Sequence, residues 1–422
     1  MKRANTPQDT VRPIELTADE YRMLVEEAER VVNETLVASD LFIANQRQLP
    51  RNEWKHVKTR EKIHVYRSRR TNLTGESSGG EFSQSSSDAS FGGRTYAPYS
   101  TAEMLLTGRN DSSSNGSVSS SSGTGLSDQS LIELMKPADS PLMVATGIVA
   151  GEFEDAVFGT ISHTERLWRL RDVYLQDPYI GMKVLASITV PTLKDPFNAL
   201  TLKWSMKELG PIARTRDCVY LEGTGTTTDS NGEQVAYYLM HSINSIKRAP
   251  GFGHLDVLRG RVSTCFIARP HNQSSIEMFA RGFFDLGGNF LSTIEHAIYA
   301  EMLLGSVQVV DLSYVKKLIW LMHEKRFSGG GASTRPFMDA KNCENCSASL
   351  SKFGGLLSSK AVCEACQKVV CGKCSVVKKI PMTVSSTEAI RKSLSFCVLC
   401  VLEAKNAPVR QVALALMQSP HA

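Results

Sequence analysis

The sequence predicts an α+β protein followed by a small metal-binding domain. Two observations support this prediction. Residues 15–326 read as a helix, strands, a helix, many strands and a last helix, an order typical of α+β domains. Eight of the ten cysteines then fall within the last 80 of the 422 residues. At this length two domains are more probable than one, and 42% hydrophobic with 22% charged residues is an ordinary soluble composition.

The first predicted element is an amphipathic helix near the N-terminus, after a flexible segment at 1–14. Thr17 with Glu20 three residues later fits a capping box. Apolar residues then recur at helical spacing: Tyr21, Leu24, Val25, Ala28, Val31 and Val32. Residues 52–70 change period, and predict two short strands joined by a charged turn.

Residues 71–130 form a Ser/Gly-rich stretch that includes "GRNDSSSNGSVSSSSGTGLSDQS". Such a composition has little to bury, so we expect a disordered insertion within the first domain. Two roles are open for it: a passive insertion, or a regulatory loop that is phosphorylated.

The main body of the sheet is expected after residue 140. A strand and a helix are predicted within 140–161, and a second helix at 163–175. Five further segments are rich in β-branched and aromatic residues, and turn signals such as "DSNGE" separate them, so they predict an antiparallel meander: 199–209, 216–229, 233–243, 257–270 and 275–288. A final helix is predicted at 312–326.

This order of elements, with "WKHVKTREKIHVYR" (54–67) opening the sheet, resembles the START family of lipid-transfer domains. The resemblance covers 15–326 and implies a helix-grip fold, in which a curved antiparallel sheet holds a long C-terminal helix. It also implies that one lipid or sterol binds in an apolar tunnel. The alternative is a helix-grip domain whose core is filled, or which binds a protein partner.

The cysteines form four CxxC pairs, beyond a Gly-rich linker at 327–336. Gaps of sixteen, four and twenty-two residues separate successive pairs: Cys343/Cys346, Cys363/Cys366, Cys371/Cys374 and Cys397/Cys400. A CxxC turn brings two thiolates to one ion, so four pairs predict two Cys₄ zinc sites. Each zinc would contribute on the order of 10 kcal/mol to folding a segment with too little core of its own. A redox motif would need only one CxxC, beside a βαβ unit.

An all-cysteine set with a four-residue central gap resembles a FYVE-type finger over 337–405, followed by a C-terminal tail at 406–422. The resemblance implies a cross-brace. Cys343, Cys346, Cys371 and Cys374 would hold one zinc ion. Cys363, Cys366, Cys397 and Cys400 would hold the other. The combination of the two domains resembles a set of proteins abundant in oomycetes.

FYVE fingers typically bind phosphatidylinositol 3-phosphate on endosomes, but this sequence departs from the residues that do so. "SKAV" (359–362) replaces the family's basic motif with its two histidines, and "SFCVLC" replaces the usual Arg-Val-Cys. The tryptophan of the family's N-terminal signature is also missing from "FMDA" (337–340). Specific recognition of this lipid is therefore not carried over by the resemblance, because the donors for its phosphate are absent.

A weaker form of membrane attachment is still open. Leu356 and Leu357 occupy the place of the family's insertion loop and could enter a bilayer interface. Lys360, Lys378 and Lys379 could each add about 1 kcal/mol of attraction to anionic lipid. The alternative is that the leucines pack onto the zinc core and the lysines are solvated.

Composition and motifs favour a non-enzymatic protein. The nine histidines are scattered, and "GTGTTTDSNG" (223–232) lacks the spacing of a phosphate-binding loop. The net charge of +5 is small, and we expect no nucleic-acid partner. Residues 1–21 hold no signal-like apolar stretch, and no run of about 18 apolar residues predicts a spanning helix. We therefore expect a cytoplasmic protein that binds a lipid and docks peripherally to an endosomal or other anionic membrane, or to a protein. The alternative function is a protein–protein interaction adaptor.

Overall fold

The computed structural model describes residues 10–69, 130–177, 179–209, 214–253, 256–288, 292–328, 340–350, 360–385 and 388–418. The helices are α2 (Ala18–Ala44), α4 (Leu131–Met135), α5 (Phe153–Thr160), α6 (Glu165–Leu175), α7 (Ser292–Gly305), α8 (Val309–Ser328), α9 (Val398–Asn406) and α10 (Val409–Gln418). The strands of the first domain are β1 (Trp54–Arg60), β2 (Ile63–Ser68), β3 (Met143–Ala150), β4 (Gly181–Thr189), β5 (Ala199–Lys207), β6 (Arg216–Thr228), β7 (Gln234–Ser242), β8 (Leu258–Arg259), β9 (Arg261–Asn272) and β10 (Ser275–Asp285).

One large sheet dominates the first domain, with strand order β1-β2-β3-β10-β9-β7-β6-β5-β4. All neighbours along this path are antiparallel, and only the short β8 runs parallel to its partner β6. The expected α+β class and the antiparallel meander are confirmed. Strand β4 was not predicted. Register shifts between Val184 and Ala186 and between Ser187 and Thr189 interrupt its alternation, so the period-2 signal is lost.

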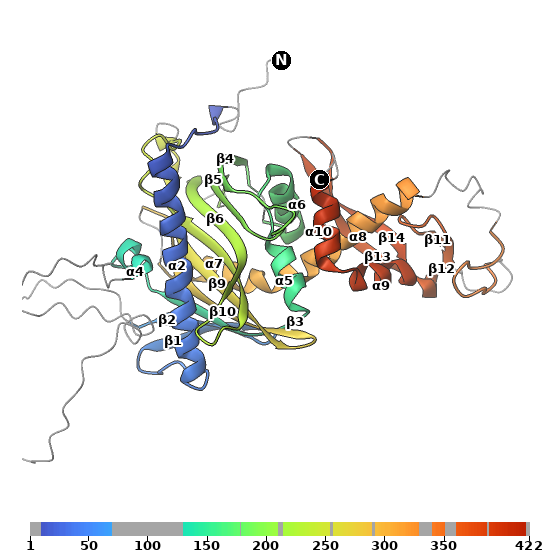
Figure 1. Cartoon of the computed structure of the whole chain (residues 1–422), viewed down its shortest axis with the longest axis horizontal. Coiled ribbons are helices and arrows are strands. Elements are labelled where there is room, and N and C mark those ends of the chain that lie inside the picture. Colours follow the sequence, from blue (N-terminus) through green and yellow to red (C-terminus); the bar gives the residue numbers. More distant parts are fainter. Residues whose placement is uncertain are drawn as a thin grey trace, which may run out of the picture.

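The two faces of the sheet pack against different helices, because successive residues of a strand point to opposite sides. Val219 and Leu221 of β6 join the cluster around α2, whereas Tyr220 between them packs beneath α6. Helix α2 covers the first face, and runs along the sheet in dark blue in Figure 1. Its predicted capping box is present, with Thr17 and Glu20 exchanging side-chain and backbone hydrogen bonds.

Helices α5, α6 and α7 pack on the second face. Helix α7 was not predicted; it presents Tyr299, Ala300, Leu303 and Leu304 to strands β1, β2 and β10. Helix α8, predicted at 312–326, then leaves the sheet and packs on α5 and α9. The C-terminal helix is thus divided, and only its first part, α7, lies along the sheet.

In its described residues, the cysteine-rich domain contains two small hairpins and helix α9, and α10 follows it. The hairpins are β11 (Lys360–Val362) with β12 (Val369–Cys371), and β13 (Ser375–Thr383) with β14 (Ala389–Cys397). Figure 1 shows them with α8, α9 and α10 at the end of the molecule away from α2. Helix α6 contacts both strands of the second hairpin, so the two domains are in direct contact.

Two of the expected boundaries differ in the structure. Val11 is buried and the Ile14 amide donates to the Leu185 carbonyl, so part of the segment expected to be flexible packs against the first domain. The segment 406–422, expected as a tail, contains α10, which packs on α5 because its Val409, Val412 and Ala413 form an apolar face. The Ser-rich insertion up to residue 129 and most of the linker lie outside the described residues. Within the described part of the chain, no helix combines the length and the apolar character needed to cross a bilayer.

Candidate functional site

An apolar hollow lies between the second face of the sheet and helix α5. Its walls are contributed by β3, β7, β9, β10, α5 and the first residue of α8, Val309. Val149, Phe266 and Met278 form the sheet side, and Ala156 and Val157 of α5 form the other. In this conformation its cavity volume is ≈ 40 Å³, which is room for about three water molecules.

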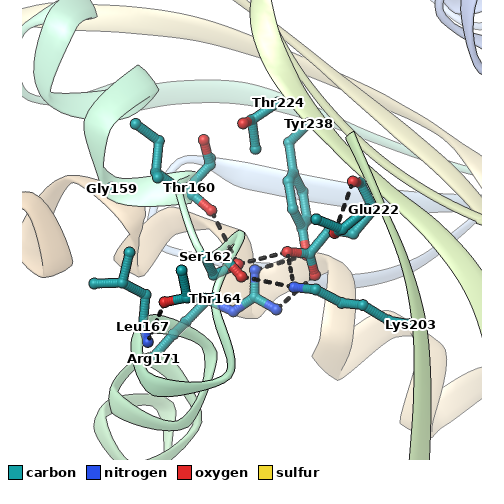
Figure 2. Close-up of polar contacts among 12 residues, drawn as sticks. Gly159, Thr160, Ser162, Thr164, Leu167, Arg171, Lys203, Glu222, Thr224 and Tyr238 are labelled. Atoms are coloured by element: carbon teal, nitrogen blue, oxygen red, sulfur yellow. Dashed lines mark hydrogen bonds and ion pairs between the residues drawn. The ribbon is translucent and has the colours of Figure 1, made fainter. Parts of the chain in front are cut away.

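Tyr238 connects this hollow to a buried polar cluster, which Figure 2 shows. Its ring lines the hollow and its hydroxyl donates to Glu222 Oε2 at 3.1 Å. The Glu222 carboxylate also accepts from Arg171 Nη2 at 2.7 Å, from Lys203 Nζ at 2.6 Å and from the hydroxyl of Ser162. Arg171 Nη1 in turn donates to the Tyr238 hydroxyl at 3.0 Å. The Tyr238 hydroxyl is therefore a polar group beside the apolar hollow, and its two hydrogen bonds hold it in position.

The cluster contains two cations and one carboxylate, all taken out of water. Burial alone would raise the pKa of Glu222, but Arg171 and Lys203 lower it to about 2. Burial lowers the pKa of Lys203 to about 8, although Glu222 opposes this shift. The carboxylate is thus ionised at neutral pH, and each cation depends on it for a partner.

His163, on the loop between α5 and α6, lies close to this cluster. Burial, together with the charges of Lys203 and Lys316, lowers the pKa of His163 to about 4. Its Nδ1 atom is buried without a hydrogen-bond partner. The imidazole is therefore neutral at pH 7, because a third cation at this place would be repelled by the two lysines.

Helix α5 is held across the hollow by residues of α8. Lys316 Nζ donates to the carbonyls of Phe158, Gly159 and Ile161 at 2.7, 3.0 and 2.8 Å. A cation at a helix C-terminus satisfies carbonyls that have no partner within the helix and opposes its dipole. Gly159 lets the two helices approach, since a Cβ there would lie 1.8 Å from the Val309 carbonyl oxygen.

Three carboxylates, those of Glu152, Glu154 and Asp155, lie at the start of α5. Glu154 and Asp155 are in its first turn, where negative charge complements the helix dipole, and Glu152 is the N-cap residue but makes no capping bond. Asp155 is buried, and accepts from the Ser313 hydroxyl and from Lys317 Nζ at 2.8 Å. It therefore joins α5 to α8.

The eight clustered cysteines form two groups of four. Within each group the sulfur atoms all lie within 4.8 Å of one another. The groups are the two sets that the FYVE resemblance implies: Cys343, Cys346, Cys371 and Cys374; and Cys363, Cys366, Cys397 and Cys400. Either group could hold a metal ion.

The spacing of the sulfur atoms fits a tetrahedral zinc ion. Zn–S bonds of about 2.3 Å in a tetrahedron separate the sulfurs by about 3.8 Å. Cys346 Sγ lies 3.7 Å from Cys371 Sγ, and Cys366 Sγ lies 3.8 Å from Cys397 Sγ. Four soft ligands fill all four positions, which is the pattern of a structural zinc site rather than a catalytic one.

Backbone amides further prepare these sulfurs for metal binding. The Cys371 amide donates to Cys343 Sγ at 3.3 Å, and the Cys400 amide donates to Cys397 Sγ at 3.4 Å. Burial opposes ionisation of Cys343, but amide hydrogen bonds from Cys371, Cys346 and Asn345 lower its pKa to about 6. The thiolate, which is the form that binds zinc, is thereby favoured.

The residues expected at a membrane are only partly described. Leu356 and Leu357 lie outside the described residues. Lys378 and Lys379 are exposed on β13. Lys360 is half-buried on β11, and its Nζ donates to the Ala340 carbonyl at 2.9 Å, so part of its charge is committed within the domain.

Sequence reasoning missed the polar cluster around Glu222. Arg171, Lys203 and Glu222 come from α6, β5 and β6, and no motif links them. A signal was nevertheless present, because Lys203 and Glu222 interrupt the apolar strand segments "LTLKWSM" and "VYLEGTG". A charged residue within a strand that is apolar on both sides indicates a buried ion pair.

Comparisons with known proteins found structural likeness only. No protein-family model and no curated protein sequence matches the chain. Among solved structures, human StAR-related lipid transfer protein 5 aligns at 10% identity over 69% of this chain and 96% of its own, with a TM-score of 0.37. Human STARD10 aligns at 8% identity over 70% and 80%, with a TM-score of 0.34. The lipid transfer and protein localization domain of human StarD13 aligns at 11% identity over 66% and 95%, with a TM-score of 0.33.

Proposed function

We propose that the first domain binds one hydrophobic molecule between the sheet and helix α5, without catalysing a reaction. We further propose that the C-terminal finger holds two structural zinc ions and docks the protein to an anionic membrane or to a partner. The first proposal depends on one observation: the apolar hollow beside Tyr238. Placing hydrocarbon there removes it from water, which stabilises the complex by about 0.8 kcal/mol per buried CH₂.

The chemistry of the hollow suggests a ligand with a long apolar body and one polar group. Val149, Phe266 and Met278 offer only carbon and sulfur to the ligand. The Tyr238 hydroxyl, held by Arg171 and Glu222, offers a hydrogen-bonding position at one side. A lipid or sterol with a hydroxyl group has this division, because that hydroxyl can donate to the remaining lone pair of the Tyr238 oxygen.

The ligand requires more space than the hollow has in this conformation. Pockets for small molecules enclose about 300–1,000 Å³, against ≈ 40 Å³ here. Helix α5, which is eight residues long, forms the wall opposite the sheet. Entry of a lipid therefore means displacing α5 from the sheet.

The finger would act through its fixed shape and its exposed cations. Two zinc ions would hold the hairpins and α9 in place. Lys378 and Lys379 point to opposite sides of β13, so one of them would face anionic lipid. The proposal accordingly includes a cytoplasmic protein that lies peripherally on a membrane, such as that of endosomes.

Native mass spectrometry of the purified full-length chain tests both halves. We expect a mass above that of the denatured chain by two zinc ions and one lipid. Two zinc ions without a lipid, together with failure to take up a fluorescent sterol and a fluorescent phospholipid, would contradict the lipid function. A chain without zinc would contradict the finger.

The small hollow also favours a second candidate function, an interaction adaptor. With a cavity volume of only ≈ 40 Å³, the space between the sheet and α5 is largely filled by side chains. The domain would then present its surface to a protein, with the finger as a second docking element. A lipid-free chain that still carries two zinc ions is the expected result for this function.

A further inference from the structure

Helix α8 belongs to both domains. Its first half contacts α5, whereas Leu318, Leu321 and Met322 in its second half are buried in the core of the cysteine-rich domain. In Figure 1 it runs alongside α9 and α10, toward the hairpins of the finger. The finger therefore completes its core with a helix that precedes the expected linker.

The buried ammonium group of Lys317 contacts both α5, beside the hollow, and α9 of the cysteine-rich domain. Lys317 Nζ lies 2.8 Å from Asp155 Oδ1 of α5 and donates to the Lys405 carbonyl of α9 at 3.1 Å. Its side chain is 2% exposed, as is that of Asp155. A shift of α9 would leave this cation with fewer partners in a place without water, which is costly.

The second cysteine group is in turn supported by α8. Lys325 Nζ donates to Cys400 Sγ at 3.5 Å and pairs with Glu403 at 2.5 Å. Arg326 pairs with Glu364, next to Cys363, at 2.8 Å. Four thiolates around Zn²⁺ would carry a net charge of about −2, and Lys325 places one ammonium group directly against this group of sulfurs.

Helix α10 is a second contact between the C-terminal part of the chain and α5. It follows α9 after two residues, and its Val409, Val412 and Ala413 pack on Phe158 and Ile161. Arg410 also donates to the carbonyls of Leu193 and Lys194 on the loop between β4 and β5. Helix α10 therefore connects α5 to α9, which begins at the second cysteine group with Cys397 as its N-cap.

We propose that metal at the Cys363–Cys366–Cys397–Cys400 group holds helix α5 closed over the hollow. Metal fixes α9, and α9 fixes both the Lys405 carbonyl that binds Lys317 and the position of α10. Loss of the metal releases both contacts, and α5 separates more readily from the sheet. This inference rests on the proposed zinc sites and hollow, and it makes the finger a control on access to the first domain.

Hydrogen exchange measured by mass spectrometry on the full-length chain tests this coupling. The zinc-loaded chain is compared with the chain stripped by a high-affinity zinc chelator, after native mass spectrometry has counted the metal. We expect the α5 peptide (153–160) to exchange at least about tenfold faster after stripping. Helix α2 covers the opposite face of the sheet, so we expect its exchange to be unchanged.

Two outcomes overturn the inference. In the first, the finger peptides lose protection on stripping while α5 keeps its own. In the second, α2 and α5 lose protection equally, which is global unfolding. The measurement needs no ligand, so a failure of the coupling is distinct from a failure to bind lipid. A chain that never carries zinc overturns the coupling and the proposed finger together.

A matched pair of lysine variants avoids complete removal of metal. We expect Lys325→Met to transfer zinc to a chromophoric chelator about tenfold faster, the usual cost of losing a group that supports a metal ligand, and to speed exchange at α5. Lys392→Met, at an exposed lysine on β14, should change neither rate. Faster zinc release in Lys325→Met without faster exchange at α5 would also overturn the inference.

Discussion

Lys317 of α8 and Asp155 of α5 form an ion pair of 2.8 Å in which each side chain is 2% exposed. The Asp155 carboxylate also accepts from the Ser313 hydroxyl, and Lys317 also donates to the Lys405 carbonyl. Both charges are thereby provided with partners in a place that excludes water. Removing either partner lowers the free energy of unfolding strongly, because the other partner stays charged and buried without a counter-ion.

We expect Lys317→Met to destabilise the protein by about 3–5 kcal/mol, because Asp155 loses the cation that compensates its burial. Urea denaturation followed by circular dichroism measures this. The double variant Asp155→Leu with Lys317→Met should recover much of the loss, since neither charge remains. A single variant within about 1 kcal/mol of the wild type would mean that the pair is not buried as described.

We expect Gly159→Ala to separate α5 from α8. The added methyl would lie 1.8 Å from the Val309 carbonyl oxygen, so the helices must move apart. The expected loss is about 2 kcal/mol or more in the free energy of unfolding. Gly305→Ala is the matched control, because a Cβ at Gly305 meets no atom within 4 Å. Helix propensity predicts that this control is neutral or stabilising by up to about 1 kcal/mol.

We expect His163 to make the protein less stable in acid. Its pKa is about 4 in the folded protein, against 6.5 for a free histidine. Between these values the unfolded chain binds a proton that the folded chain does not, so stability falls as the pH drops from 6.5 to 4. The loss attributable to this group is at most about 3 kcal/mol.

The variant His163→Gln should remove this part of the pH dependence. Thermal unfolding from pH 7 to pH 4 measures it as the difference between variant and wild type. Burial raises the pKa of Asp172 to about 7, which acts in the opposite direction over the same range. That contribution cancels in the difference, because both proteins carry Asp172. Parallel curves for the two proteins would contradict the predicted role of His163.

We expect Cys371→Ser to lower the bound zinc from two ions to one. Cys371 lies in the first group of four sulfurs, and the second group is left intact. Native mass spectrometry measures the stoichiometry on the full-length chain. Cys218→Ala is the control. It lies outside both groups, and burial raises the pKa of its thiol to about 12. Loss of metal in the control, or two ions in Cys371→Ser, would contradict the assignment of ligands.

Local features of the sequence predicted much of the fold. The capping box at Thr17 and the strands that alternate apolar and polar residues formed where they were expected, because each depends on neighbours a few residues away. Strand β4 was missed because its bulges place Met182, Leu185 and Ile188 in the core at intervals of three. That spacing resembles neither an alternating strand nor a regular helix.

The division of the C-terminal helix could not be predicted from its pattern. Helix α8 was expected to lie along the sheet, as the START resemblance implies. Its apolar residues instead pack into the core of the cysteine-rich domain: Val315, Leu318, Leu321 and Met322. Lys316 and Lys317 bind α5 through a hydrogen bond and an ion pair. A helix that is buried from two directions shows no single apolar stripe, so its sequence does not reveal which neighbours it has.

The sequence by itself identified the cysteines that could hold metal, because each CxxC pair is a local turn that can bring two sulfurs to one ion. It also determined the α+β class through short-range periodicity. Only the tertiary structure decided that Glu222 meets Arg171 and Lys203, and that Asp155 meets Lys317. Lys317 lies 162 residues after Asp155 in the chain. Contacts at such separations form only when the whole sheet and its helices have packed, since burial then favours an arrangement in which buried charges such as Glu222 and Asp155 have partners.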